Sequence, residues 1–222
     1  REPSGLAYNA DDNLLFIADT SNNRIMVYDL TADQFVHVLG QNDFDHGAAN
    51  KGGAVGVSTL SRPVSVSYQN DLLFVADQGN HRVLVYALGA NIEDVDNAIR
   101  VLGQPNFEAN QIQPGFGAPN QLPSPLSVLS SGNKLYVALT DRVMIFDITD
   151  IQTVTNATYV LGQEDFPTNA WSFLPAGAFN FGFGFYKGLA TAENSLYVVD
   201  GAYNRILSFD TQIIEKIGRA HV

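Results

Sequence analysis

A carboxylate recurs five residues before an arginine at three places along the chain. The pairs are Asp19 with Arg24, Asp77 with Arg82, and Asp200 with Arg205. A tight hairpin would bring such residues together, so that the carboxylate accepts a charge-assisted hydrogen bond from the guanidinium. Two roles are open: a clamp that fixes a turn, or a ring of charges that binds a ligand. The spacing favours the clamp, because the pair recurs whereas a single ligand site would break the repeat.

A second motif, Leu-Gly-Gln-x-x-Phe, occurs three times. Its glycine, glutamine and phenylalanine members are Gly40, Gln41, Phe44, Gly103, Gln104, Phe107, Gly162, Gln163 and Phe166. Glycine permits a backbone turn that other residues resist, and a glutamine amide can bond exposed loop backbone. The phenylalanine can pack between neighbouring elements. We therefore expect a structural role for this motif as well.

Aromatic residues concentrate in one long connection, at 164–185 and just after it. They include Trp171, Phe173, Phe179, Phe181 and Tyr186. The connections 42–60 and 105–122 are similarly long, and long loops often carry binding functions. The aromatic side chains either pack on the fold or form a patch that contacts a ligand. They are the binding candidates that the sequence offers.

Residues for catalysis or metal binding are few. The sequence lacks the known motifs of zinc proteases and serine hydrolases. It also lacks the glycine-rich motifs that bind dinucleotides or nucleotide phosphates. Asp43, Asp45 and His46 lie together, and Glu93-Asp94-x-Asp96 is a second acidic run. Calcium takes six to eight oxygen ligands, so solvated loops are favoured over ion sites. We predict no cofactor, with calcium at one of these runs as the alternative.

Both motifs share a period of about sixty residues. The repeated arginines, Arg142 included, are 58, 60 and 63 residues apart. Within the second period, apolar and polar residues alternate or apolar runs occur at 64–68, 72–76, 82–87 and 98–102, with turn residues between them. Each period therefore predicts four short antiparallel strands and no helix. A lone sheet of this kind cannot bury both faces, so the copies must stack side by side around an axis.

The third period departs from the pattern. Leu139 stands where the other periods have aspartate, and the turn before Arg142 is two residues shorter. The carboxylate contact is therefore in doubt for Arg142 alone.

The stretch Ala76-Asp77-Gln78-Gly79-Asn80-His81-Arg82-Val83 resembles the signature of NHL-repeat β-propellers. The resemblance implies an all-β chain with four four-stranded antiparallel blades, which form an open arc of a ring that is commonly six-bladed. Residues 1–215 would be one propeller piece, partnered by the remaining blades of the same chain, with a blade face left unpaired at each end of the arc. The blades are expected at about 1–41, 60–104, 122–163 and 185–215. Residues 217–222 match a translated sequencing adapter, and we expect them to be a non-native tail.

Charge and composition narrow the classes of partner. The chain has 12 basic and 23 acidic residues and a formal charge of −11, without a Lys/Arg cluster, which disfavours nucleic acid. It has no cysteine, which excludes disulfides and thiol chemistry. No apolar run approaches the roughly 18 residues of a membrane span. The acidic, cysteine-free composition and the resemblance favour an extracellular or cell-envelope location.

The expected function is a non-enzymatic binding or scaffold module that presents a loop-decorated face to a protein or carbohydrate ligand. The alternative is a six-bladed-propeller hydrolase or lyase with a metal in the central channel, held by side chains at the first-strand ends. Those ends offer Glu2, Arg62, Ser124 and Lys187, of which only Glu2 is an acid. The sequence therefore favours the binding module.

Overall fold

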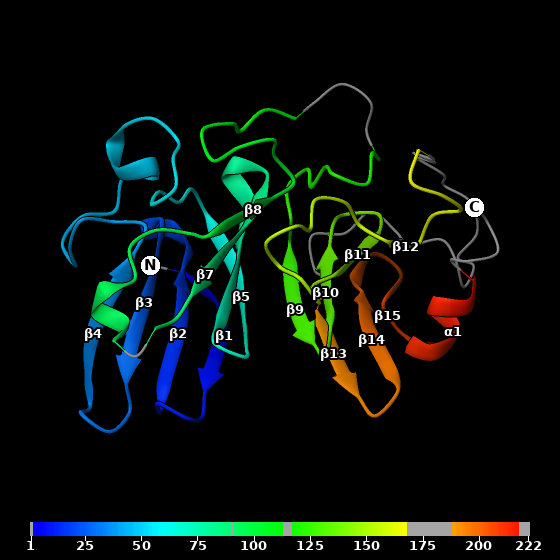
Figure 1. Ribbon diagram of the computed structural model, residues 1–222, viewed down its shortest axis with the longest axis horizontal. Coiled ribbons are helices and arrows are strands. Elements are labelled where there is room, and N and C mark those ends of the chain that lie inside the picture. The colour runs from blue at the N-terminus through cyan, green and yellow to red at the C-terminus, as the bar shows by residue number, and fades with distance from the viewer. Residues whose placement is uncertain (1, 90, 113–116, 168–187, 218–222) are drawn as a thin grey trace.

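The computed structural model describes residues 2–89, 91–112, 117–167 and 188–217, which form four antiparallel sheets side by side (Figure 1). We call these sheets blades 1 to 4. Blade 1 contains β1 (Pro3–Asn9), β2 (Leu14–Asp19), β3 (Arg24–Asp29) and β4 (Gln34–Leu39). Blade 2 contains β5 (Pro63–Gln69), β6 (Leu72–Asp77), β7 (Arg82–Ala87) and β8 (Arg100–Leu102). Blade 3 contains β9 (Ser127–Ser131), β10 (Lys134–Ala138), β11 (Val143–Asp147) and β12 (Tyr159–Leu161), and blade 4 contains β13 (Leu189–Ala192), β14 (Ser195–Asp200) and β15 (Arg205–Asp210).

Each sheet is a meander in which consecutive strands pair in chain order. Tight turns made by Asn and Asp residues at positive φ, such as Asn13 and Asn70, join the first and second strands. The strand register then places Asp77 directly opposite Arg82 across the next turn. The predicted antiparallel sheets, arranged as propeller blades, are confirmed. The aspartate and the arginine that lie five residues apart in the sequence are a cross-strand pair in the structure.

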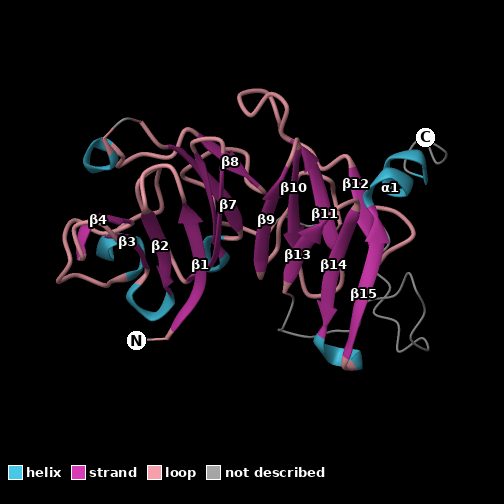
Figure 2. Cartoon of the chain, turned by 90° about the horizontal axis from the view of Figure 1, so that it is seen from below, coloured by secondary structure: helices cyan, strands magenta, loops and turns pink. Residues whose placement is uncertain are grey.

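The core lies between the blades. Phe16 and Ile25 of blade 1 pack in one buried cluster with Leu73 and Leu84 of blade 2. Two further clusters join blade 2 to blade 3 and blade 3 to blade 4. Seen from below in Figure 2, the sheets stand next to one another along the length of the molecule. Because each large side chain contributes about 1.5–3 kcal/mol on burial, this stacking is the main source of stability.

Blade 4 differs from the other three. Its described part has three strands, and the chain then enters a short helix, α1 (Thr211–Ile217), where the repeat predicted only strands. Asp210 starts this helix, because its Oδ1 atom accepts hydrogen bonds from the Gln212 and Ile213 amides at 2.8 and 3.2 Å. The rest of the expected adapter tail, 218–222, lies outside the described residues. None of the helices formed by the described residues is long and apolar enough to cross a membrane.

The Tyr86 hydroxyl is a defect in the otherwise apolar packing between blades 1 and 2. The side chain is fully buried, its hydroxyl has no hydrogen-bond partner among the described residues, and burial raises its pKa. At the same repeat position, blades 3 and 4 carry Phe146 and Phe209, which face Leu135 and Leu196 as Tyr86 faces Leu73.

We therefore expect Tyr86→Phe to raise the free energy of unfolding by about 1 kcal/mol, because an unpaired buried hydroxyl is removed. Urea denaturation measures the change, as a higher midpoint at an unchanged slope. A lower midpoint would mean that the hydroxyl has a bonding partner, and the interpretation would fail.

Candidate functional site

The repeated motifs meet on one face of the arc. We call this the loop face; it comprises the turns Thr20–Asn22 and Gln78–Asn80 and the connections 42–60 and 105–112. In Figure 1 these segments lie at the top, opposite the hairpin turns that join first and second strands. The Gln41 amide links the segments directly, since its Nε2 atom donates to the carbonyls of Asn23 and Ala48 at 3.0 and 2.8 Å.

Arg82 is the centre of the best-developed network. Its Nε atom donates to Asp77 Oδ2 at 2.7 Å, and both side chains are 0% exposed. Its Nη1 atom donates to the Phe107 carbonyl at 2.5 Å, and Nη2 donates to the carbonyls of Gly56 and Thr59 at 3.0 and 2.8 Å. One buried guanidinium therefore ties the hairpin turn to two loops that are distant in sequence.

Asp77 is held by further donors besides the arginine. The Ser61 amide donates to Oδ1 at 2.7 Å, and Asn80 Nδ2 donates to Oδ2 at 2.8 Å. Burial raises the pKa of Asp77, against the lowering effect of Arg82 and of these hydrogen bonds. The carboxylate and the guanidinium therefore depend on each other, since either charge alone would be buried without compensation.

Blades 1 and 4 contain the same cross-strand pair. Arg24 Nε lies 2.8 Å from Asp19 Oδ2, and Arg205 Nε lies 3.0 Å from Asp200 Oδ2. Arg24 Nη1 also donates to the Phe44 carbonyl. The guanidinium thus does more than close the hairpin, because it also binds the backbone of the Leu-Gly-Gln-x-x-Phe motif.

Blade 3 reaches the same arrangement with a different acid. Arg142 Nη1 donates to the Phe166 carbonyl at 2.8 Å, and its Nη2 atom lies 2.8 Å from Asp141 Oδ2. Asp141 is the residue immediately before the arginine and occupies the role left by Leu139. This corrects the doubt about Arg142; the missed signal was an acid adjacent to the repeated arginine.

The motif glycines and glutamines shape the turn beneath the loops. Gly40, Gly103 and Gly162 have φ angles of 89°, 92° and 91°, a region that favours glycine. Gln104 Nε2 donates to the carbonyls of His81 and Gln111, both at 3.1 Å. Gln163 Nε2 lies 3.3 Å from the Asp141 carbonyl and 3.2 Å from its Oδ2 atom.

The motif phenylalanines differ in burial. Phe107 packs against the cluster between blades 1 and 2, and Phe166 against the cluster between blades 2 and 3. Phe44, in contrast, is 42% exposed. The difference follows from position, since each phenylalanine packs toward the preceding blade and the described residues place none before blade 1.

His81 joins blade 2 to blade 3. It adopts a left-handed φ of 54°, and its Nδ1 atom accepts a hydrogen bond from the Ser124 amide at 3.1 Å. Asn23 occupies the same position in blade 1, where its Oδ1 atom accepts from the Arg62 amide at 2.8 Å. The turn residue therefore carries an acceptor that fixes the entry into the next blade.

The His81 contact predicts a pH dependence of stability. Nδ1 accepts a hydrogen bond only when it carries no proton, and burial lowers the pKa of His81 from 6.5. As the pH falls below 6.5, the unfolded chain takes up this proton before the folded chain does, so stability is lost in that direction. His81→Asn should keep the stability at pH 7, because asparagine supplies the same acceptor, and should reduce the loss toward pH 5. Urea denaturation across this range tests it, and equal pH slopes in both proteins would refute the role of His81.

Comparison with known proteins now identifies the fold family. The family model for the NHL repeat matches residues 1–28 and 60–86, which span the first three strands of blades 1 and 2 except for the last residue of β3 and of β7. The chain carries NHL repeats and folds as an NHL-repeat β-propeller chain. Among curated proteins, it resembles the chloroplastic protein SUPPRESSOR OF QUENCHING 1 of Arabidopsis thaliana, with 30% identity over 111 residues. That match covers 49% of this chain and 10% of the plant protein, so the chain corresponds to a small part of that relative.

Solved structures share the fold of this NHL chain. A protein from Lactobacillus plantarum is similar with a TM-score of 0.58, 13% identity, and coverage of 96% of this chain and 53% of that one. The WD40 β-propeller domain of Doa1 has a TM-score of 0.53 at 10% identity, covering 95% and 51%. The computationally designed Ika4 protein has a TM-score of 0.52 at 8% identity, covering 94% and 91%. At these identities the likeness establishes the propeller fold alone.

The acidic runs of the NHL chain form turns. His46 Nδ1 lies 2.6 Å from Asp43 Oδ1 on the exposed surface, and this contact raises the pKa of His46 and lowers that of Asp43. Asp45 contributes its amide, which donates to Asp43 Oδ1. In the second run, the Asn91 side chain accepts from the Glu93 amide. Within the described part of the chain, no three acidic or histidine side chains gather so as to hold a metal ion.

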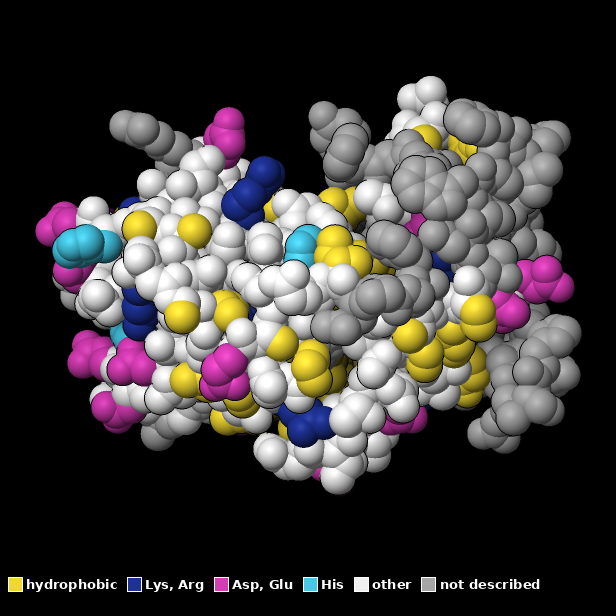
Figure 3. All heavy atoms as spheres, turned by 90° about the horizontal axis from the view of Figure 1, so that it is seen from above, with side chains coloured by type: hydrophobic (Ala, Val, Ile, Leu, Met, Phe, Trp, Pro, Cys, Tyr) yellow, Lys and Arg dark blue, Asp and Glu magenta, His cyan; other side chains and the backbone are white. Residues whose placement is uncertain are grey.

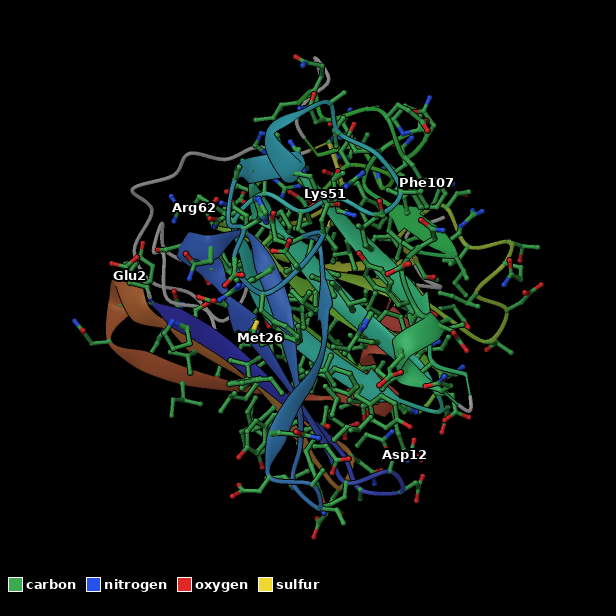
Figure 4. The ribbon with its side chains drawn as sticks, turned by 90° about the vertical axis from the view of Figure 1, so that its left-hand side faces the viewer. Glu2, Asp12, Met26, Lys51, Arg62 and Phe107 are labelled. Atoms are coloured by element: carbon green, nitrogen blue, oxygen red, sulfur yellow. The ribbon has the colours of Figure 1, made fainter. Side chains whose placement is uncertain are left out.

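The first-strand ends of the NHL chain present mixed charges. Glu2, Arg62 and Ser124 precede β1, β5 and β9, and all three have positive φ angles. Figure 4 shows Glu2 and Arg62 toward one end of blade 1 and Asp12 toward the other. Glu2 Oε2 accepts from Ser21 Oγ at 2.9 Å. One carboxylate near an arginine does not make a donor set for a divalent cation; Lys187 lies outside the described residues.

The loop face of the NHL chain is seen from above in Figure 3. Its Lys and Arg side chains are scattered, whereas acidic side chains gather along one edge of the described surface. The predicted aromatic contacts Trp171, Phe173, Phe179, Phe181 and Tyr186 all fall in 168–187, outside the described residues. The described loop face is therefore largely polar, with acidic side chains along one edge and apolar side chains in several places.

Proposed function

We propose that this NHL-repeat chain is a binding module that holds a protein ligand on its loop face. The carrying observation is the buried arginine network, in which Arg82 binds the loop carbonyls of Gly56, Thr59 and Phe107. Loops that are held in place before binding lose less conformational entropy when a ligand arrives. The network therefore suits a preorganised surface for recognition.

The chemistry of the loop face favours one class of ligand. Asp43, Asp45 and Glu108 are exposed on it, and Ile112 is an apolar side chain that is 44% exposed. The chain as a whole carries a charge of −11. A protein segment with basic residues around an apolar side chain complements this surface, and such binding weakens as salt rises.

A peptide-display selection against the immobilised chain tests this proposal. Ile112→Ser should weaken the selected peptides about tenfold or more, since an apolar contact is lost. Leu30→Ser is the matched control, because Leu30 is 45% exposed in the β3–β4 turn on the opposite side of the blade. It should leave binding unchanged.

Three outcomes contradict the proposal. They are a selection that enriches no peptide, peptides that ignore Ile112→Ser, and peptides that lose binding with Leu30→Ser. Enrichment of basic-apolar peptides whose affinity falls with salt supports it.

A further inference from the structure

The three interfaces between consecutive blades repeat one arrangement. Each blade offers a forward face to the next blade, which meets it with a backward face. Phe16 and Ile25 form the forward face of blade 1 and share a cluster with Val66 and Leu73 of blade 2. The corresponding residues between blades 2 and 3 are Phe74, Val83, Val128 and Leu135, and those between blades 3 and 4 include Tyr136, Val143, Leu196 and Val198. All of these side chains are at most 5% exposed.

The forward face of blade 4 is exposed. By strand register, Tyr197 corresponds to Phe16, and Ile206 corresponds to Ile25. Phe16 and Ile25 are 0% exposed, whereas Tyr197 and Ile206 are 39% and 69% exposed. Val199 lies beside them and is 37% exposed. Blade 4 thus carries an apolar face of the kind that elsewhere receives a blade.

The backward face of blade 1 is exposed in the same way. Leu6 corresponds to Val66, because each lies opposite the matching residue of the second strand, Ile17 or Val75. Val66 is 5% exposed, whereas Leu6 is 65% exposed. Tyr8, two residues further along β1, is 50% exposed.

A polar contact that accompanies the interfaces between blades 1 and 2 and between blades 2 and 3 is also split between these two ends. Between blades 1 and 2, the side chain of Asn23 accepts from the amide of Arg62, a residue with positive φ. Blade 4 has the acceptor position in Asn204, with a φ of 50°, and blade 1 has the donor position in Glu2, with a φ of 61°. Among the described residues, the structure gives no hydrogen bond to the Asn204 side chain or from the Glu2 amide. The two ends therefore hold complementary halves of one interface.

We infer that blade 4 of one chain packs against blade 1 of a second copy, head to tail, through this interface. We choose a second copy as the partner because the two ends are complementary. Blade 4 exposes a forward apolar face and an acceptor position, and blade 1 exposes the backward apolar face and the donor position that would match them. Exposed apolar patches of this kind mark interaction surfaces. Because the contact joins two different faces, it builds a closed ring or an open chain of copies.

The test uses two full-length variants, each with one face changed. Leu6→Lys places a charge on the blade 1 face, and Ile206→Lys places one on the blade 4 face. Both residues are exposed in the single chain, so folding should be unaffected, which circular dichroism and thermal melting check. Analytical ultracentrifugation then measures association. The unchanged chain should associate with rising concentration, and each variant alone should do so at least about tenfold more weakly.

Mixing the two variants gives the deciding result. Leu6→Lys keeps an intact blade 4 face and Ile206→Lys keeps an intact blade 1 face, so the mixture should form a one-to-one heterodimer that grows no further. Ile99→Lys, on an exposed apolar residue just before β8 of blade 2, which is not one of the two end blades, should associate like the unchanged chain. The inference is overturned if the unchanged chain stays monomeric at high concentration, if either variant alone associates as strongly as the unchanged chain, or if the mixture yields no heterodimer.

Discussion

Replacing Arg82 by methionine should lower the free energy of unfolding by about 3–5 kcal/mol, because it leaves the carboxylate of Asp77 buried without a counter-charge. Both side chains are 0% exposed, and three loop carbonyls lose their donor at the same time. This is a large part of the roughly 5–15 kcal/mol that separates the folded from the unfolded state of a typical domain. Urea denaturation at pH 7 measures it.

The Arg82→Met variant should also acquire a specific pH dependence. Burial raises the pKa of Asp77, and loss of Arg82 removes an interaction that lowers it. A carboxyl whose folded pKa is raised is most favourable when protonated, so stability is lost as the pH rises through that pKa. The deficit of the variant should therefore shrink as the pH falls from 7 toward 4. Adding Asp77→Asn should recover part of the loss at pH 7; a deficit that neither acid nor this second change reduces would contradict the account.

Replacing Gly103 by alanine should lower the free energy of unfolding by about 2–4 kcal/mol, combining backbone strain with overpacking. Gly103 has a φ of 92°, and an added Cβ atom would lie 2.7 Å from the Leu122 Cβ atom. Leu122 is 1% exposed in the cluster between blades 2 and 3, so it has little room to move. Thermal and urea unfolding measure the change.

Gly132→Ala is the matched control for this prediction. Gly132 also has a positive φ, at 59°, but an added Cβ atom meets nothing within 4 Å. The cost there should be about 1 kcal/mol, from the backbone conformation alone. Equal losses at the two positions would show that the close approach of Leu122 does not matter.

The sequence carried enough information to predict the blades. Alternation of apolar and polar residues defines the strands, and the five-residue spacing of Asp77 and Arg82 becomes a cross-strand pair. The left-handed turn at Gly103 was likewise anticipated from the residue type. These features are local, so that residue identity and spacing are sufficient to specify them.

The loop anchoring was not predictable in the same way. The acceptors of the Arg82 guanidinium are the backbone carbonyls of Gly56, Thr59 and Phe107. Because every residue type has a backbone carbonyl, the sequence does not show which carbonyls accept these hydrogen bonds. Asp141 was missed because it pairs with Arg142 from the adjacent position instead of across the turn. The loop contacts depend on tertiary packing between segments, whereas the Asp141–Arg142 contact is local but has a different spacing from the other repeats.

The short helix α1 shows a different reason for a missed feature. Asp210 ends β15 much as Asp29 ends β3, and both accept hydrogen bonds from amides two and three residues later. After Asp29 the chain turns back at Asp33, which has a φ of 56°, whereas after Asp210 it continues as helix. The same local start therefore leads to two structures, and the following residues decide between them.

Hydrogen exchange of the loop amides tests the central claim, that the repeated network holds the loop face rigid. The Asn50 amide donates to the Leu60 carbonyl at 2.8 Å, and the Gly53 amide donates to the Asn50 carbonyl at 2.9 Å. We predict that both are protected in the unchanged chain, and that Gln41→Ala speeds their exchange about tenfold or more while β2 and β3 stay protected. Unprotected exchange of these amides in the unchanged chain, or rates that Gln41→Ala does not alter, would contradict the claim.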